Sequence, residues 1–139
     1  MTHHNLNESI ALKKERLSLE VVVLGAVKAA NLGLMFLLEL SVLGSAGYWG
    51  FTVNAQWPLK IVAGIGAPLL LAVLWGLFAA GGGTNATYPL HGFARMLFEV
   101  AWFGTGALAL YGAASLTPAA ILFACYLVNG VLRLAWNQG

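Results

Sequence analysis

Charged side chains are rare in this sequence. Seven lysines and arginines and five acidic residues occur among 139 residues, which is 9% of the chain. Soluble domains carry about 25% charged residues. Because so few charges cannot cover a water-facing surface, the composition excludes an ordinary soluble domain and indicates that lipid is the main solvent. The net charge of +2 comes with no basic run interleaved with aromatic residues, so no nucleic acid is expected as a partner.

Cysteine and the familiar catalytic motifs are also nearly absent. The single cysteine, Cys125, excludes an intrachain disulfide and is expected to pack in an apolar run. No cluster of histidine, cysteine or glutamate has metal-ligand spacing, and neither a phosphate-binding loop nor a nucleophile elbow occurs. We therefore expect no metal and no cofactor, and an enzyme is the least favoured class of function.

Long apolar runs dominate what remains, since 60% of the residues are hydrophobic. A membrane-spanning helix needs about 20 apolar residues. Four runs reach that length, at about residues 19–43, 58–80, 91–113 and 118–136. They predict an all-α polytopic membrane protein, folded as one antiparallel bundle of four transmembrane helices over residues 19–139. Residues 1–18 form a polar to amphipathic tail, which either lies on the membrane surface or is a partly ordered leader. No cleaved signal peptide is expected.

Glycine and proline predict where the helices end or bend. The stretch "GSAGYWG" at residues 44–50 is expected to end the first span. Pro58 suits the first turn of the second span, and Pro68 should kink that span near its middle. "GGGT" at residues 81–84 indicates a flexible turn, and Thr117 is the expected N-cap of the fourth span.

The basic residues predict the orientation. With an even number of spans, both termini and the second loop lie on one side of the membrane. Five of the seven basic residues are near the helix ends on that side, and Lys60 is alone on the other side. The five are Lys13, Lys14, Arg16, Arg95 and Arg133. The positive-inside bias then places both termini in the cytoplasm. Membrane lipid is the expected partner of the outer surface.

Polar residues within the spans fall on single helical faces. On the first span, Lys28, Asn31 and Glu39 lie within about 80° of one another at 100° per residue. The third span carries Arg95, Glu99 and Trp102 on one face, and the fourth carries Asn129 and Arg133. Because a charge facing lipid is costly, these stripes predict an inward-facing polar interior.

Estimated depths in the membrane predict two ion pairs. Lys28 and Glu99 come out at the same level, with Arg95 one turn away from Glu99 on its own helix, and Glu39 comes out near Lys60. Such pairs either fix the register of the helices or belong to a functional site. Trp75 and Trp102 are expected to pack, with an aromatic ligand cage as the alternative. The candidate residues for ligand or ion binding are Glu39, Lys28, Asn31, Glu99, Arg95, Trp75, Trp102 and Asn129.

Two functions fit this pattern. The favoured one is binding or transport of a small solute or ion through the polar interior, with Glu39 as a proton-labile or cation site. Since four spans are too few to enclose a wide pathway, a homo-oligomer could supply the rest. The alternative is a non-catalytic scaffold or a lipid- or partner-binding module in which the buried charges are structural.

Three segments carry a resemblance to a known family: "LGLMFLLELSVLGSAGYWGF", "APLLLAVLWGLFAA" and "RMLFEVAWFGTGALAL". Over about residues 31–129 the chain resembles the YrdB-like family, a group of small bacterial four-span membrane proteins of unknown function. The resemblance depends on Glu39, Trp49-Gly50, Pro68, Trp75-Gly76, and Arg95 with Glu99. It implies a four-span fold in a bacterial inner membrane and assigns no activity. Family members often have a proline just after "WGLFAA", where this chain has Gly81–Gly83.

Overall fold

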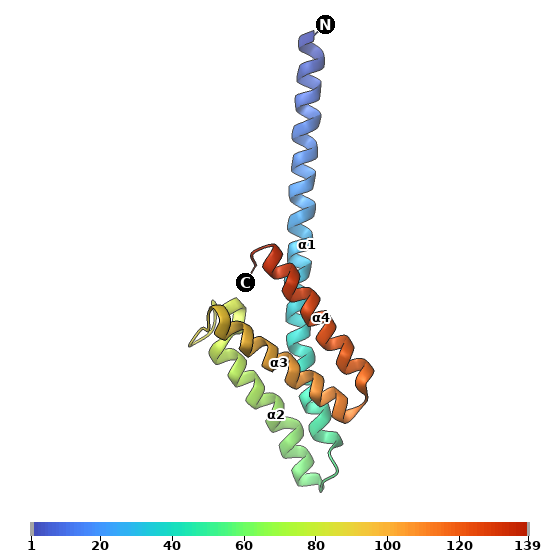
Figure 1. The fold of residues 1–139 in the computed structure, drawn as a ribbon, viewed down its shortest axis with the longest axis vertical. Helices are drawn as coiled ribbons and strands as arrows, with labels where there is room; N and C mark the ends of the chain where they lie inside the picture. Colours follow the sequence, from blue (N-terminus) through green and yellow to red (C-terminus); the bar gives the residue numbers. More distant parts are fainter. Residues whose placement is uncertain (1, 139) are drawn as a thin grey trace. The chain divides into compact units, whose positions relative to one another are not determined.

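The computed structural model describes residues 2–138, and all the regular structure in that range is helical. The elements are α1 (Thr2–Thr52), α2 (Trp57–Phe78), the short 3₁₀ helix η1 (Ala80–Gly83), α3 (Gly92–Ala113) and α4 (Leu116–Ala135) (Figure 1). Each of the four long helices contains a stretch that is long and apolar enough to cross a membrane. The prediction of an all-α bundle of four membrane-spanning helices is therefore confirmed.

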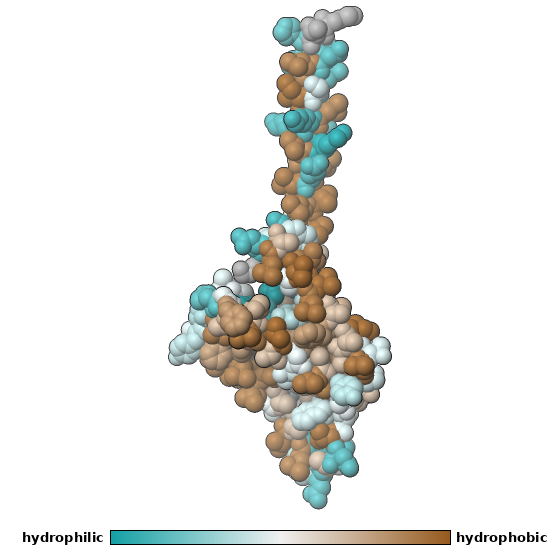
Figure 2. Space-filling view, viewed as in Figure 1, coloured by the Kyte–Doolittle hydropathy of each residue, from teal (hydrophilic) through white to brown (hydrophobic). Residues whose placement is uncertain are grey.

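The chain divides into two compact units, residues 1–34 and 35–139, and each is described by itself. The first unit is the N-terminal part of α1, and its side chains are a mixture of hydrophilic and hydrophobic types (Figure 2). Residues 3–18, which the sequence predicted to be a surface helix or a partly ordered leader, are helical and exposed. The second unit contains the rest of α1 together with α2, α3 and α4.

The predicted end of the first span was wrong, because α1 continues through "GSAGYWG" to Thr52. The glycines of this stretch allow close packing instead of ending the helix. A Cβ atom on Gly50 would overlap backbone atoms of Ala63 and Gly64 in α2. Two helix backbones can approach this closely only where small residues meet, which is a common way of packing helices within membranes.

Both prolines of α2 lie where the sequence predicted. Pro58 is in the first turn, where its missing N–H costs nothing, and Pro68 lies inside the helix. Proline at position 68 removes the hydrogen bond that the carbonyl of Gly64 would otherwise accept. A Cβ on Gly47 of α1 would sit 3.2 Å from that carbonyl oxygen, so the glycine backbone covers the carbonyl and can offer it a weak Cα–H contact.

The connection from α2 to α3 is more ordered than the predicted flexible turn. Gly81 and Gly82 adopt positive φ values of 59° and 68°, a conformation that favours glycine. The N–H of Tyr88 donates to the carbonyl of Leu77 at 2.7 Å, and the N–H of Leu90 donates to that of Phe78 at 3.1 Å. These bonds hold the loop against the end of α2.

The helices α3 and α4 are joined by two residues and pack side by side (Figure 1). The expected N-cap of α4 was wrong by two residues, since the helix begins at Leu116 and Ser115 is its N-cap. Ser115 has the extended backbone of an N-cap but makes no capping hydrogen bond with its side chain. Thr117 therefore lies within the first turn.

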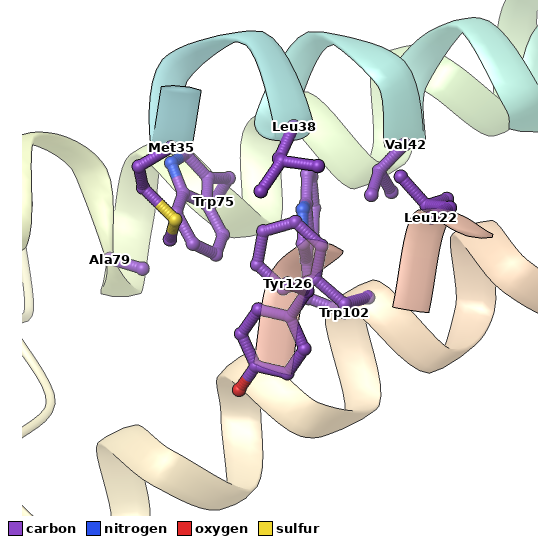
Figure 3. Close-up of a cluster of buried hydrophobic side chains, with 9 residues drawn as sticks. Met35, Leu38, Val42, Trp75, Ala79, Trp102, Leu122 and Tyr126 are labelled. Atoms are coloured by element: carbon purple, nitrogen blue, oxygen red, sulfur yellow. The ribbon is translucent and has the colours of Figure 1, made fainter. Parts of the chain in front are cut away.

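An aromatic core fills the space between the helices of the second unit (Figure 3). The ring centroids of Trp75 and Trp102 are 4.7 Å apart, and those of Phe103 and Tyr126 are 4.1 Å apart at 13° between their planes. A Cβ on Gly106 of α3 would lie 2.8 Å from a methyl group of Val42, so α1 also packs closely on α3. The buried hydrophobic cluster comprises Met35, Leu38, Val42, Trp75, Ala79, Trp102, Phe103, Leu122 and Tyr126.

Candidate functional site

A buried ionic cluster connects α3 with α4. Glu99 is only 6% exposed, and its Oε1 accepts a hydrogen bond from Arg95 Nε at 2.8 Å, one helical turn away on α3. Arg133 of α4 donates from Nη2 to Glu99 Oε2 at 2.6 Å and from Nη1 to Oε1 at 3.4 Å. Both carboxylate oxygens are therefore engaged, which is the condition under which a buried ion pair is tolerated.

Asn129 positions the guanidinium of Arg133 within this cluster. Its side-chain oxygen accepts a hydrogen bond from Arg133 Nε at 3.1 Å, and Asn129 itself is fully buried. The two residues are one turn apart on α4, so the amide and the guanidinium lie on the same helical face. With three of its N–H groups bound, Arg133 presents its charge to Glu99 in a bidentate geometry.

Glu39 of α1 is the second carboxylate of this region. It is half-buried, and the charged groups whose field acts on it are Glu99, Arg133 and Arg95. Two arginines and Glu99 sum to one positive charge. An ionised Glu39 therefore brings this set of four groups to neutrality.

The predicted pair of Glu39 with Lys60 was wrong. Lys60 lies near the start of α2, and its Nζ is 5.7 Å from the ring centroid of Trp57. Lysine and tryptophan three residues apart share a helical face. Lys60 therefore makes a cation–π contact within its own helix instead of an ion pair with Glu39 of α1. Glu39 faces Trp75 instead.

The two core tryptophans each carry a buried indole N–H that makes no hydrogen bond. Trp75 is 8% exposed and Trp102 is 4% exposed. Both ring nitrogens lie on the side of the rings that faces α1, from which Met35 and Leu38 project (Figure 3). The N–H of Trp75 is close enough to Glu39 to interact with its carboxylate, but it does not complete a well-formed hydrogen bond.

The rings themselves are packed, as the sequence predicted. Trp75 stacks with Phe98 at 6.0 Å between centroids, and Phe98 stacks with Trp102 at 6.4 Å. Their faces are occupied by one another, so they do not form an open aromatic cage. Only the N–H edges of the two indoles remain available for a polar contact.

The structure brings together six of the eight predicted site residues, all in the second unit: Glu39, Trp75, Arg95, Glu99, Trp102 and Asn129. Lys28 and Asn31 belong to the first unit, so the pair of Lys28 with Glu99 stays a prediction. The contact of Arg95 with Glu99 is present as expected.

The residue that the prediction missed is Arg133. The sequence placed it on the polar face of its helix but about one turn too shallow to meet Glu99. The depth was taken from the position along the helix, whereas an arginine side chain can reach along it. Its spacing of four from Asn129 was the signal that could have identified it.

A separate apolar groove of about 460 Å³ lies between α3 and α4. It opens on the surface of the helices and is lined by aliphatic and aromatic side chains. This lining suits an apolar contact such as a lipid chain. Its lining residues are Gly104, Ala107, Leu108, Tyr111, Leu116, Ala119, Ala120 and Phe123.

Four apolar helices around a paired ionic cluster define the chain as a multi-pass membrane protein. Residues 33–128 match a family described as a protein of unknown function, DUF2568, and the chain belongs to that family. The match covers Glu39 and Glu99 but ends just before Asn129 and Arg133. No curated protein and no solved structure is detectably similar to the chain.

Proposed function

We propose that this membrane protein binds a small solute or ion next to Glu39, within the membrane. One observation carries the proposal: a half-buried carboxylate within a spanning helix interacts with the indole N–H of Trp75, and the adjacent ring of Trp102 has a buried N–H that makes no hydrogen bond. An ionisable group in a membrane span is expensive, and so is an unsatisfied buried donor. A bound polar solute would offset both costs.

Transport would require more than one copy of the chain. The space between the four helices is filled by the aromatic core, so a single copy does not enclose a passage for a solute. Two copies that meet near Glu39 would place two carboxylates along a shared path. We therefore propose that each copy binds the solute and that a homo-oligomer transports it.

The second candidate function is a membrane scaffold or a lipid- or partner-binding module. The full pairing of Glu99 with Arg95 and Arg133 favours it, because a satisfied ionic cluster can serve only to fix the register of α3 against α4. In that case Glu39 would have no ligand.

We further propose that the protein resides in a bacterial inner membrane with both termini in the cytoplasm. The basic residues Lys13, Lys14 and Arg16 before the first span support the orientation. The similarity to the YrdB-like family supports the bacterial origin.

The Glu39→Gln variant tests the proposed transport. Purified protein would be reconstituted in liposomes containing a pH-sensitive dye, and proton movement would be followed after adding sodium chloride, sodium nitrate or tetraphenylphosphonium. The wild type is expected to respond to at least one of these probes with a rate that depends on pH. Glu39→Gln should lose that pH dependence, because an amide cannot exchange a proton.

Glu15→Gln is the matched control, because it removes a carboxylate that is exposed in the first unit. It should behave as the wild type does. Identical pH profiles for the wild type and Glu39→Gln, with every probe, would refute proton-coupled transport through Glu39 and favour the scaffold.

A further inference from the structure

We infer that the ligand at Glu39 is a small monovalent anion, such as chloride or nitrate, which binds together with a proton. This inference rests on the proposed function and names its class of ligand. It depends on two features of the second unit: the charge balance around Glu99, and the two indole N–H groups that face α1.

Arg95 and Arg133 both bind Glu99, at 2.8 Å and 2.6 Å, and leave one positive charge in excess. Glu39 is the carboxylate in the field of that excess charge. Within a membrane, uncompensated charge is costly, so the four groups are most stable when their sum is zero. An ionised Glu39 achieves this, and so does a protonated Glu39 accompanied by one bound anion.

A cation fits this balance poorly. If it bound to ionised Glu39, the region would carry one net positive charge in a medium of low dielectric constant. If it bound to protonated Glu39, the region would carry two net positive charges. A monovalent anion with a proton leaves the sum at zero, so the two should bind and leave together.

The available hydrogen-bonding groups agree with this choice. An indole N–H is a donor only, so Trp102 requires an acceptor, and Trp75 has only its incomplete contact with Glu39. Their ring centroids are 4.7 Å apart, and both nitrogens lie on the side that faces α1 (Figure 3). Buried donors without acceptors near an excess positive charge suit an anion. Met35, a flexible side chain that lies beside Trp75, would have to move to admit it.

The groups around Glu39 leave it as the residue that exchanges the proton. Trp75 faces it from α2, Glu99 and Arg95 act on it from α3, and Arg133 acts on it from α4. Both carboxylate oxygens of Glu99 are already bound by its two arginines. Tyr126 of α4 lies in the field of Glu99 and Arg133. Along α1, residues 40–52 carry no charge, and Lys28, which belongs to the first unit, is not counted in this balance.

The test is to titrate the purified full-length protein in detergent at pH 5 and pH 8 and to follow its thermal unfolding and proton uptake. Sodium chloride and sodium nitrate are the anion probes. Sodium gluconate at equal ionic strength is the control for salt, and tetraphenylphosphonium gluconate is the cation probe. For the wild type we expect chloride or nitrate to bind at least about tenfold more tightly at pH 5, with about one proton taken up per anion at intermediate pH.

Two variants sharpen the test. Glu39→Gln imitates the protonated carboxyl, so it should bind the anion about equally at both pH values and without proton uptake. Trp102→Phe keeps the ring but removes one donor, and should weaken anion binding by about tenfold or more at pH 5. Trp136→Phe, near the end of α4, is the matched control and should bind as the wild type does.

The outcomes separate this inference from the proposed function. If tetraphenylphosphonium or sodium binds in a way that Glu39→Gln abolishes, while the anions do not bind, the site is real and the anion inference is overturned. If no probe distinguishes the wild type from Glu39→Gln, both the inference and the proposed function are overturned. Anion binding that is unchanged in Trp102→Phe and independent of pH would also overturn the inference.

Discussion

Glu99 lies between two guanidinium groups, and this arrangement explains how a carboxylate is tolerated within a membrane span. Arg95 contributes one hydrogen bond from the same helix, whereas Arg133 contributes two from α4. Every oxygen of the carboxylate therefore has a partner. Removing a single member of such a buried group leaves an uncompensated charge, which costs more than the intact cluster contributes.

We predict that Glu99→Ala destabilises the protein by about 3–5 kcal/mol, because two buried or half-buried arginines lose their shared partner. The measurement is thermal or denaturant unfolding of the purified protein in detergent, with Glu15→Ala as the control for loss of an exposed carboxylate. The exposed control should change the free energy of unfolding by less than about 0.5 kcal/mol. Equal stability of Glu99→Ala and the control would show that the cluster contributes nothing.

At the scale of the helices, glycine determines how closely α1 approaches its neighbours. Gly50 meets the backbone of α2 at Ala63 and Gly64, and Gly106 of α3 meets Val42. A glycine in the interior of a soluble helix is a weakness, but at a crossing between membrane helices it permits contact between backbones. The same residues that predicted an end to the first span therefore hold it in the bundle.

We predict that Gly50→Ala destabilises the protein by about 1–3 kcal/mol, because the new methyl group meets backbone atoms, which cannot move aside as a side chain could. Gly66→Ala in α2 is the matched control, since a Cβ there has nothing within 4 Å outside its own helix. The free energies of unfolding of both variants would be compared in the same detergent. A Gly50→Ala variant as stable as Gly66→Ala would contradict the close crossing of α1 and α2.

At the scale of the whole molecule, four spans place successive loops on opposite sides of the membrane. The connections at residues 53–56 and 114–115 should face one side, and the connection at residues 79–91 should face the other. The positive-inside bias predicts that the longer connection, which precedes Arg95, faces the cytoplasm.

Cysteine labelling tests this arrangement because the chain has only one native cysteine. In a Cys125→Ala background, Asn54→Cys and Ser115→Cys are expected to react with an impermeant maleimide from outside the cell. Asn85→Cys should react only after the membrane is opened. Labelling of Asn54→Cys and Asn85→Cys from the same side would contradict a second span that crosses the membrane.

The sequence alone determined the features that depend on local physics. Four apolar runs of sufficient length predicted four spans, because the need to cross about 30 Å of hydrocarbon is a property of each segment by itself. The contact of Arg95 with Glu99 was predictable for the same reason, since residues four apart on a helix are neighbours whatever surrounds them.

Only the tertiary structure decided which side chains meet between helices. Arg133 joins Glu99, Glu39 faces Trp75 instead of Lys60, and α1 continues through its glycines to Thr52. Each of these depends on how far a helix is rotated and shifted against its neighbour. Rotation and shift are set by the packing of small residues such as Gly50 against Gly64, and no single segment contains that information.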